Sequence, residues 1–255
     1  MTNSLRRVLG ILGTMAICVM LAGCSLTQST ATTTGSTPGV RTAPAASCPA
    51  AVAKLVDWTV TAQSELNGKF DKTKSMIDSP EGIRRLESQV RALAQKSVDQ
   101  GSALRLSVFA GSVATVTDVL VCPTLAVKYN NKKARSTKAK HLADVVSDEA
   151  WAAVRDTTPA AGGKGSSIVG AWIAFADDPP LAPRRHAVMV SDGRGPRETA
   201  TADLSGYQSV ALYAVGRVAG RAGTTGNTTD LVEAWRTWLG DHHAKKVTVT
   251  SQELQ

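Results

Sequence analysis

The stretch at residues 187–190 constrains the fold of this chain more than any other. Its sequence, Ala-Val-Met-Val, is apolar throughout, and it is bounded by Pro183-Arg184-Arg185 on one side and Ser191-Asp192-Gly193 on the other. A strand that is covered on both faces has such a continuous apolar run, because neither face points to water. We therefore expect a central strand here, within a sheet that carries helices on both sides.

Segments before and after this run predict further strands and helices in alternation. Residues 104–109 alternate between apolar and polar side chains as a half-buried strand does, and a second run at 115–121 completes a predicted hairpin. The other predicted strands lie at 52–56, 209–215 and 246–250, and the predicted helices lie at 61–77, 80–99, 142–154, 168–176 and 229–239. The pattern predicts an α/β fold with a doubly wound, mostly parallel central sheet, one antiparallel edge hairpin and helices on both faces.

The amino-terminal residues carry a targeting signal. Arg6 and Arg7 precede an apolar run at 8–20, which ends in Leu21-Ala22-Gly23-Cys24. A basic start, a short apolar segment and small exit residues are typical of a secretory signal peptide, and the run is too short to span a membrane. The last four residues resemble the lipobox of bacterial lipoproteins. The alternative is an ordinary signal peptide, or an uncleaved anchor, with Cys24 at this place by chance.

The lipobox resemblance implies a location and an anchor. In that family the signal, here 1–23, is removed, and the cysteine, here Cys24, is acylated with chains such as palmitate. Two or more acyl chains hold a protein stably on a bilayer. We therefore expect a lipoprotein on the extracytoplasmic face of the cell membrane.

A flexible tether is predicted between the lipid and the folded part. The segment after Cys24, up to residue 47, is rich in Ser, Thr, Ala, Pro and Gly, and Arg41 is its only charge. Such a composition buries too little apolar surface to become ordered. The lipidated residue and tether thus span 24–47, and residues 48–255 suffice for one domain with a full core.

The cysteines reduce to one pair under this interpretation. Cys18 leaves with the signal and Cys24 takes the lipid, so Cys48 and Cys122 remain. Outside the cytoplasm a lone pair of cysteines is more often a disulfide than two free thiols.

The charge of the chain is basic, with a formal net charge of +8. An exported protein rarely meets nucleic acid, so anionic lipid head groups or acidic wall polymers are the expected neighbours, and nucleic acid is not. The densest cluster of cations lies at 128–140, where Lys and Arg occur without an acid. Its simplest interpretation is the solvated start of a helix.

Three short segments resemble the metal-ion-dependent adhesion site of von Willebrand factor A domains. They are Asp57-Trp58-Thr59-Val60-Thr61, Gly165-Ser166-Ser167 and Ser191-Asp192-Gly193. In that family an Asp-x-Ser-x-Ser motif ends the first strand, a Thr lies in a later Gly-rich loop, and an Asp ends the fourth strand. The resemblance implies a metal site made by five residues, in which every replacement keeps the hydroxyl: Asp57, Thr59, Thr61, Ser166 and Asp192.

The chemistry of this set suits a hard divalent cation. Mg²⁺, or Mn²⁺ in its place, takes about six oxygen ligands and retains several waters. Each residue also has a plain structural interpretation, because Asp, Thr and Ser commonly cap loops and helices. The implied fold would also return the hairpin's second strand toward the base of the first, which brings Cys122 near Cys48.

Three classes of function are weighed on these observations. We favour a non-enzymatic binding module whose cation holds an acidic group of a protein partner. The alternative is a metal-free structural or envelope-assembly lipoprotein of the same fold. An enzyme has little support, because the segment at 165–169 is not a Gly-x-Ser-x-Gly nucleophile elbow and the glycines at 162–165 lack the spacing of a phosphate-binding loop.

Overall fold

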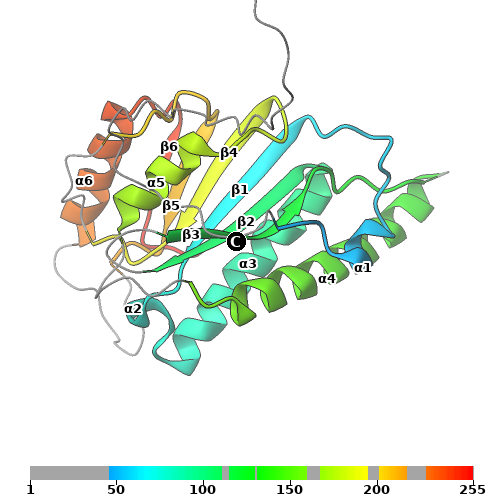
Figure 1. The fold of residues 1–255 in the computed structure, drawn as a ribbon, viewed down its shortest axis with the longest axis horizontal. Helices are drawn as coiled ribbons and strands as arrows, with labels where there is room; N and C mark the ends of the chain where they lie inside the picture. Colours follow the sequence, from blue (N-terminus) through cyan, green and yellow to red (C-terminus); the bar gives the residue numbers. More distant parts are fainter. Residues whose placement is uncertain are drawn as a thin grey trace, which may run out of the picture. The chain divides into compact units, whose positions relative to one another are not determined.

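A six-stranded sheet forms the centre of the fold, which is given by a computed structural model. The structure describes residues 46–110, 115–129, 131–159, 167–194, 201–216 and 228–254. The strands lie in the order β3-β2-β1-β4-β5-β6, and only β2 and β3 pair antiparallel (Figure 1). Their bounds are Ser64–Asp71 (β1), Ala103–Ala110 (β2), Thr115–Cys122 (β3), Arg184–Val190 (β4), Ser209–Tyr213 (β5) and Val247–Val249 (β6). The predicted fold class is confirmed, with β4 in the interior of the sheet.

Several of the helices begin at a residue whose side chain caps their first turn. Their bounds are Ala50–Ala53 (α1), Lys74–Ile77 (α2), Pro80–Gln100 (α3), Lys132–Asp156 (α4), Ile168–Asp177 (α5) and Thr228–Asp241 (α6). At the start of α3 the Ser79 hydroxyl accepts a hydrogen bond from the Gly82 amide at 3.0 Å, and Pro80 occupies the first helical position. The helix ends at Gly101, whose φ of 60° is the left-handed conformation that glycine adopts readily.

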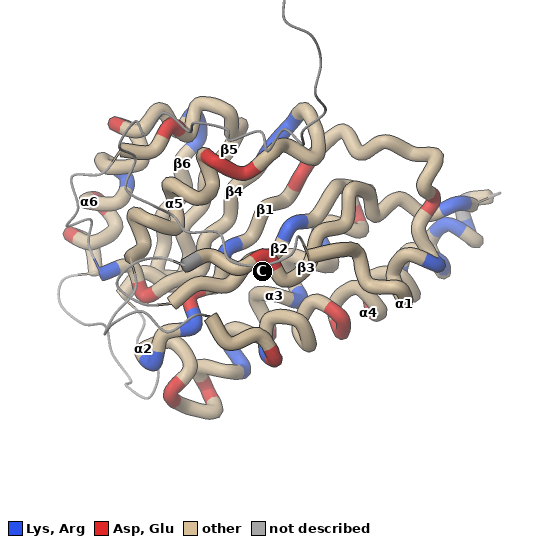
Figure 2. Tube along the Cα trace, in the orientation of Figure 1, with Lys and Arg blue, Asp and Glu red and all other residues tan. Residues whose placement is uncertain are grey.

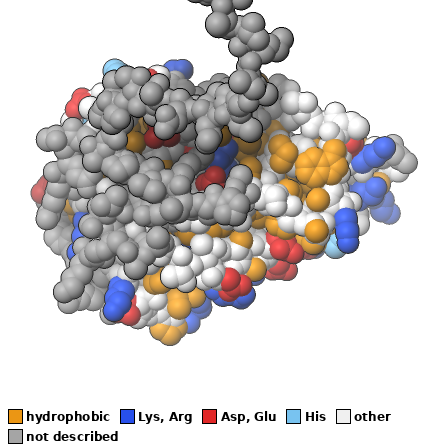
Figure 3. Space-filling model, in the orientation of Figure 1, with side chains coloured by type: hydrophobic (Ala, Val, Ile, Leu, Met, Phe, Trp, Pro, Cys, Tyr) orange, Lys and Arg blue, Asp and Glu red, His pale blue; other side chains and the backbone are white. Residues whose placement is uncertain are grey.

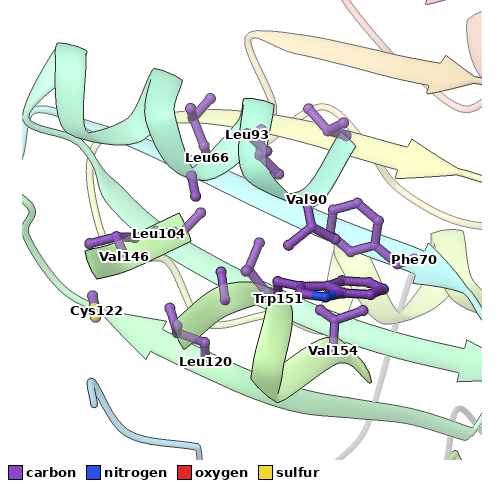
Figure 4. Packing of buried hydrophobic residues seen from close by; sticks show 14 of the residues in the cluster. Leu66, Phe70, Val90, Leu93, Leu104, Leu120, Cys122, Val146, Trp151 and Val154 are labelled. Carbon is purple, nitrogen blue, oxygen red and sulfur yellow. The ribbon is translucent and has the colours of Figure 1, made fainter. Parts of the chain in front are cut away.

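Helices cover both faces of the sheet. Helices α3 and α4 lie on one face, and α5 and α6 lie on the other (Figure 1). On the α3 and α4 side, Leu66 and Phe70 of β1 pack with Leu93 of α3 (Figure 4). On the opposite side, Met189 of β4 belongs to a cluster with Trp172 of α5 and other aromatic residues. Because both faces of β4 are covered, its sequence has no polar alternation.

The first strand is the main correction to the predicted elements. Residues 52–56 were predicted as a strand, but they include the end of the short helix α1 and make only one bridge, between Val56 and Val127. Residues 61–77 were predicted as a helix, but they contain β1, which lies between β2 and β4. The true first strand therefore ends at Asp71 and not at Asp57.

The face of β1 that points toward α5 is polar yet buried. Glu65, Asn67 and Lys69 are all fully buried on it. The Lys69 ammonium lies 2.8 Å from a carboxylate oxygen of Asp178, the C-cap residue of α5, and the Asn67 amide donates to that oxygen at 2.7 Å. Burial lowers the pKa of Lys69, and the charge of Asp178 opposes this effect. These contacts join the end of α5 to the sheet.

The carboxylate of Glu65 is joined to the next strand in the same layer. Its Oε2 lies 3.3 Å from the Arg185 guanidinium, which also donates to the Tyr207 hydroxyl at 2.6 Å. Buried charges are stable only when they are paired and hydrogen-bonded. This polar layer explains why β1 does not have the apolar sequence of a central strand.

The predicted disulfide is confirmed. Cys48 and Cys122 are bonded, with their Cα atoms 4.5 Å apart. Cys122 ends β3 opposite Leu104, near the start of β2, so the bond fastens the residues before α1 to the amino end of the sheet. The described part of the chain contains no helix that is both long and apolar enough to cross a membrane.

Candidate functional site at the carboxyl ends of β1 and β4

Two acidic residues meet where β1 and β4 end. The two strands are parallel neighbours, with Phe70 opposite Val190, so Asp71 and the residues after β4 lie at the same edge of the sheet. The chain leaves β1 toward β2 on one side, while β4 and β5 lie on the other, which makes this the point where the strand order reverses. Open α/β sheets bind ligands at such a point, beyond the carboxyl ends of the strands.

The Asp71 carboxylate is fully buried and links the two strand ends. Its Oδ2 accepts a hydrogen bond from the Ser191 hydroxyl at 2.7 Å, and its Oδ1 accepts one from the Thr73 amide at 2.9 Å. The hydroxyls of Thr73 and Ser75 lie 2.9 Å apart and are half-buried. The buried carboxylate thus binds the Ser191 hydroxyl directly, and the hydroxyls of Thr73, the N-cap of α2, and Ser75, within α2, form a pair that begins two residues after it.

The Asp192 side chain is also buried, with 2% of its surface exposed. Its Oδ2 accepts no hydrogen bond among the described residues, and lies 3.4 Å from Nε of the exposed Arg194. Backbone contacts fix its position, because the Gly216 amide donates to the Asp192 carbonyl at 2.6 Å and the Trp235 indole donates to the Gly193 carbonyl at 2.9 Å. A buried carboxylate oxygen without a donor has unused capacity to bind a cation.

The electrostatics of the site disfavour two ionised carboxylates. Burial, together with the smaller effect of the negative charge of Asp192, raises the pKa of Asp71 to about 6, although hydrogen bonds from Ser191 and Thr73 oppose the shift. Desolvation and a like charge both favour the neutral form of a carboxyl group. A bound cation would remove this penalty, because it attracts both carboxylates.

The donor set fits a hard divalent cation. Carboxylates from Asp71 and Asp192 and hydroxyls from Thr73, Ser75 and Ser191 are the oxygen ligands that Mg²⁺ prefers in proteins, together with water. Among the residues that the structure describes, no group of three or more His, Cys, Asp or Glu side chains is placed to hold a metal. The site is therefore one of two acids supplemented by hydroxyls.

The structure does not bring the predicted first-loop residues to this site. Asp57, Thr59 and Thr61 precede β1, at the amino end of the sheet, whereas Asp192 follows β4 at the carboxyl end. The Asp57 carboxylate accepts hydrogen bonds from the amide and hydroxyl of Thr59, at 3.1 and 2.7 Å, which also lower its pKa. These residues form a capped turn, and their predicted place at the end of the first strand was wrong.

The other predicted positions differ in their outcomes. Asp192 lies at the end of the fourth strand, where we expected it, and meets Asp71 there. Ser166 and Cys24 lie outside the described residues.

The sequence contained a signal for the site that pattern reading missed. Asp71-Lys72-Thr73-Lys74-Ser75 has the Asp-x-Ser-x-Ser spacing, with Thr for the first Ser. The motif follows a segment in which Leu66, Gly68 and Phe70 alternate with polar residues, which indicates a strand. Three of those polar residues, Glu65, Asn67 and Lys69, are fully buried in the structure. The sequence shows only that they are polar, and polar residues usually indicate exposure, so the segment was predicted as a polar helix.

Comparisons with known proteins leave the family of the chain open. No protein-family model and no curated protein matches the sequence. Two solved structures of proximal thread matrix protein 1 from the mussel byssus are similar to this chain, at 15% and 16% identity and a TM-score of 0.37 each. The similarity covers 75% and 76% of this chain but only 44% of the mussel protein in each case. The fold assignment therefore rests on the strand order and pairing described above.

Proposed function

We propose that this protein is a membrane-anchored extracytoplasmic lipoprotein whose von Willebrand factor A-like domain binds an acidic group of a protein partner through a divalent cation. The observation that carries the proposal is the meeting of Asp71-x-Thr73-x-Ser75 with Ser191-Asp192 at adjacent strand ends. Asp71 and Asp192 would hold Mg²⁺ or Mn²⁺ with help from the hydroxyls. The cation would supply a positive charge and an open coordination position for a carboxylate of the partner.

The membrane attachment rests on Leu21-Ala22-Gly23-Cys24 and on the tether that follows. A thioether-linked diacylglycerol on Cys24, detected by mass spectrometry of the amino-terminal peptide from native membranes, is the expected result. An unmodified Cys24, with the preceding signal still attached, would refute the lipoprotein part of the proposal. It would leave the cation site unaffected.

The cation site is tested by thermal unfolding and calorimetric titration with Mg²⁺ and Mn²⁺. A ligand present at 100 times its Kd stabilises the folded state by about 2.7 kcal/mol, which shifts the melting temperature by several degrees. We expect this shift in the wild-type protein and its loss in Asp192→Asn. The matched control is Asp57→Asn, which changes one carboxylate at the opposite end of the sheet and should keep the full shift. Equal responses from both variants would argue against the site.

One contact favours the metal-free alternative of a structural or envelope-assembly lipoprotein. The Arg194 guanidinium, 3.4 Å from Asp192, supplies a positive charge beside the carboxylate without any metal. If this ion pair replaces the cation, Arg194→Ala should destabilise the protein, and Mg²⁺ or Mn²⁺ should not change the melting temperature of the wild type. If the site binds metal, Arg194→Ala should leave metal binding intact or strengthen it.

A further inference from the structure

A second surface lies at the amino end of the sheet, opposite the candidate cation site. Three of its apolar side chains are unusually exposed: Trp58 (51%), Val60 (42%) and Tyr129 (44%). They come from two segments, one between α1 and β1 and the other between β3 and α4. Figure 3 shows a gathering of hydrophobic side chains beside Lys and Arg on the face that it draws. Exposed aromatic residues that gather on one surface commonly mark an interaction site.

The two segments hold each other in place. The Asp57 amide donates to the Ala126 carbonyl at 2.8 Å, and Val56 pairs with Val127 as an antiparallel bridge. The Trp58 indole donates to the Ala53 carbonyl at 2.9 Å, which fixes the ring on the end of α1. The surface is therefore preformed, so little conformational entropy would be lost when it binds.

A groove runs between these apolar residues and the start of α4. Its volume is about 530 Å³, and its apolar lining includes Val60, Val98, Val127 and Ala139. Tyr129 also lines it, and the Arg135 guanidinium stacks over the Tyr129 ring at 5.0 Å from the centroid. Aromatic and aliphatic groups thus lie directly beside a cation.

Further cations are exposed just before α4 and in its first turns, on the same helix as the Arg135 that lines the groove. Lys128 precedes α4, Lys138 donates to the Lys128 carbonyl at 3.1 Å, and Lys133 and Lys140 are exposed on the same helix. Figure 2 shows Lys and Arg positions grouped near α1, at the start of α4. The acids nearby are Asp57, whose pKa the charge of Lys128 helps to lower, and Asp99, which lines the groove. The cations outnumber these acids, so the surface favours an anionic partner.

We propose that this amino-end surface docks the domain on an anionic phospholipid bilayer. Aromatic side chains prefer the head-group level of a membrane, and basic residues near them are attracted to anionic lipids. The place where the chain enters the domain fits this occupant: the Cys48–Cys122 bond anchors the end of the segment that begins at Cys24, at the same end of the sheet as Trp58. The tether argument rests on the proposed lipidation, whereas the charge and apolar argument does not.

Docking in this orientation has a consequence for the cation site. Because β1 and β4 are parallel, Asp71 and Asp192 lie at the carboxyl end of the sheet, while Trp58 and Tyr129 lie at the amino end. A domain that rests on the bilayer through its amino end would turn the cation site away from the lipid. In this single orientation the lipid anchor and the basic surface would both face the membrane, and the partner site would face away from it.

Vesicle co-sedimentation tests the docking with a chain that carries no lipid. The chain from Ser25 to Gln255 contains every strand, helix and core residue described above. We expect it to partition into phosphatidylcholine vesicles with 30% phosphatidylglycerol at least tenfold more strongly than into pure phosphatidylcholine. High salt should remove the difference, because it screens exposed charges. Equal partition into both vesicles, or binding to neither, would overturn the proposal.

Two sets of variants assign any binding to this surface. Each basic residue near an anionic membrane accounts for about a fivefold change in partition, so the triple change Lys128→Glu, Arg135→Glu and Lys138→Glu should reduce binding more than tenfold. The charge-matched control changes exposed cations elsewhere (Arg84→Glu, Arg236→Glu and Lys245→Glu) and should lose clearly less binding than the first triple variant. An equal loss in both triple variants would mean that net charge alone drives binding, which would overturn the assignment.

The apolar contribution has its own test. Trp58→Ser together with Tyr129→Ser should lower partition about tenfold while the melting temperature stays near that of the wild type. If the double change instead converts a dimer to a monomer in sedimentation velocity, with no vesicle binding by the wild type, the surface joins two copies of the chain and the proposal is wrong. Metal titration of the same variants separates the docking proposal from the cation-site proposal. Asp71 and Asp192 are unchanged in these variants, so metal binding should not change with vesicle binding.

Discussion

Replacement of Asp71 by asparagine should stabilise the metal-free protein. The carboxylate is fully buried and faces the like charge of Asp192, and its pKa is raised from 3.8 to about 6. Asparagine has nearly the same shape and carries no charge. Its carbonyl can accept a hydrogen bond from the Thr73 amide, and its NH₂ group can donate one to the Ser191 hydroxyl. Asparagine can therefore replace both hydrogen bonds that Asp71 makes to these two residues.

The size of the effect follows from the shift in the pKa of Asp71. A folded-state value of about 6 against 3.8 differs by about 2.2 units, which corresponds to at most about 3 kcal/mol at about 1.4 kcal/mol per unit. Because the folded-state pKa is raised, the penalty is absent below pH 3.8, grows as the pH rises, and is complete above about pH 6. The gain in Asp71→Asn should therefore be 1–3 kcal/mol, on the order of the full penalty, at pH 7.5 and should shrink toward pH 4.5.

Urea unfolding in the presence of a chelator, at several pH values between 4.5 and 7.5, measures this difference. Addition of Mg²⁺ should then stabilise the wild type and not the variant, which is the exchange of stability for function seen at binding sites. The reasoning is refuted if Asp71→Asn unfolds more easily than the wild type at pH 7.5 in chelator. It is also refuted if the stability difference between the two proteins does not depend on pH.

Three further variants test the fold that positions the site. Loss of the disulfide in Cys48→Ser/Cys122→Ser should cost about 4 kcal/mol in denaturant unfolding, since the bond closes a loop of 74 residues; an unchanged midpoint would contradict this. Lys69→Met should cost on the order of 3–5 kcal/mol, because it breaks a buried ion pair from one side, and a neutral result would show that the pair is dispensable. Gly193→Ala should weaken both stability and Mn²⁺ affinity, because its φ is 62° and a Cβ would lie 3.0 Å from Val215 side-chain atoms; normal affinity would mean that this loop does not shape the site.

The fold class was predictable because most of the elements have ordinary sequence patterns. The apolar run within β4, the alternation in β2 and the capping residues of α3 each identify their element from local chemistry. The order of these elements then restricts the topology to a doubly wound sheet. The disulfide could be predicted because few cysteines remain once the amino-terminal ones are assigned.

The position of the candidate site was not predictable in the same way. Strand β1 buries Glu65, Asn67 and Lys69 on one face, and their partners Arg185 and Asp178 lie more than 100 residues away in the sequence. Local pattern cannot reveal such long-range pairing, so a polar strand resembles an exposed segment. Because β1 was not recognised as a strand, the first strand was predicted at residues 52–56 and the metal motif at Asp57.

The position of a bound Mn²⁺ ion tests the central claim most directly. Anomalous diffraction from crystals soaked in Mn²⁺ would locate the ion without any assumption about affinity or stability. We predict one peak beyond the ends of β1 and β4, between Asp71 and Asp192, which is absent in crystals of Asp192→Asn. A peak beside Asp57, or none in the region between Asp71 and Asp192 at millimolar Mn²⁺, would contradict the cation site.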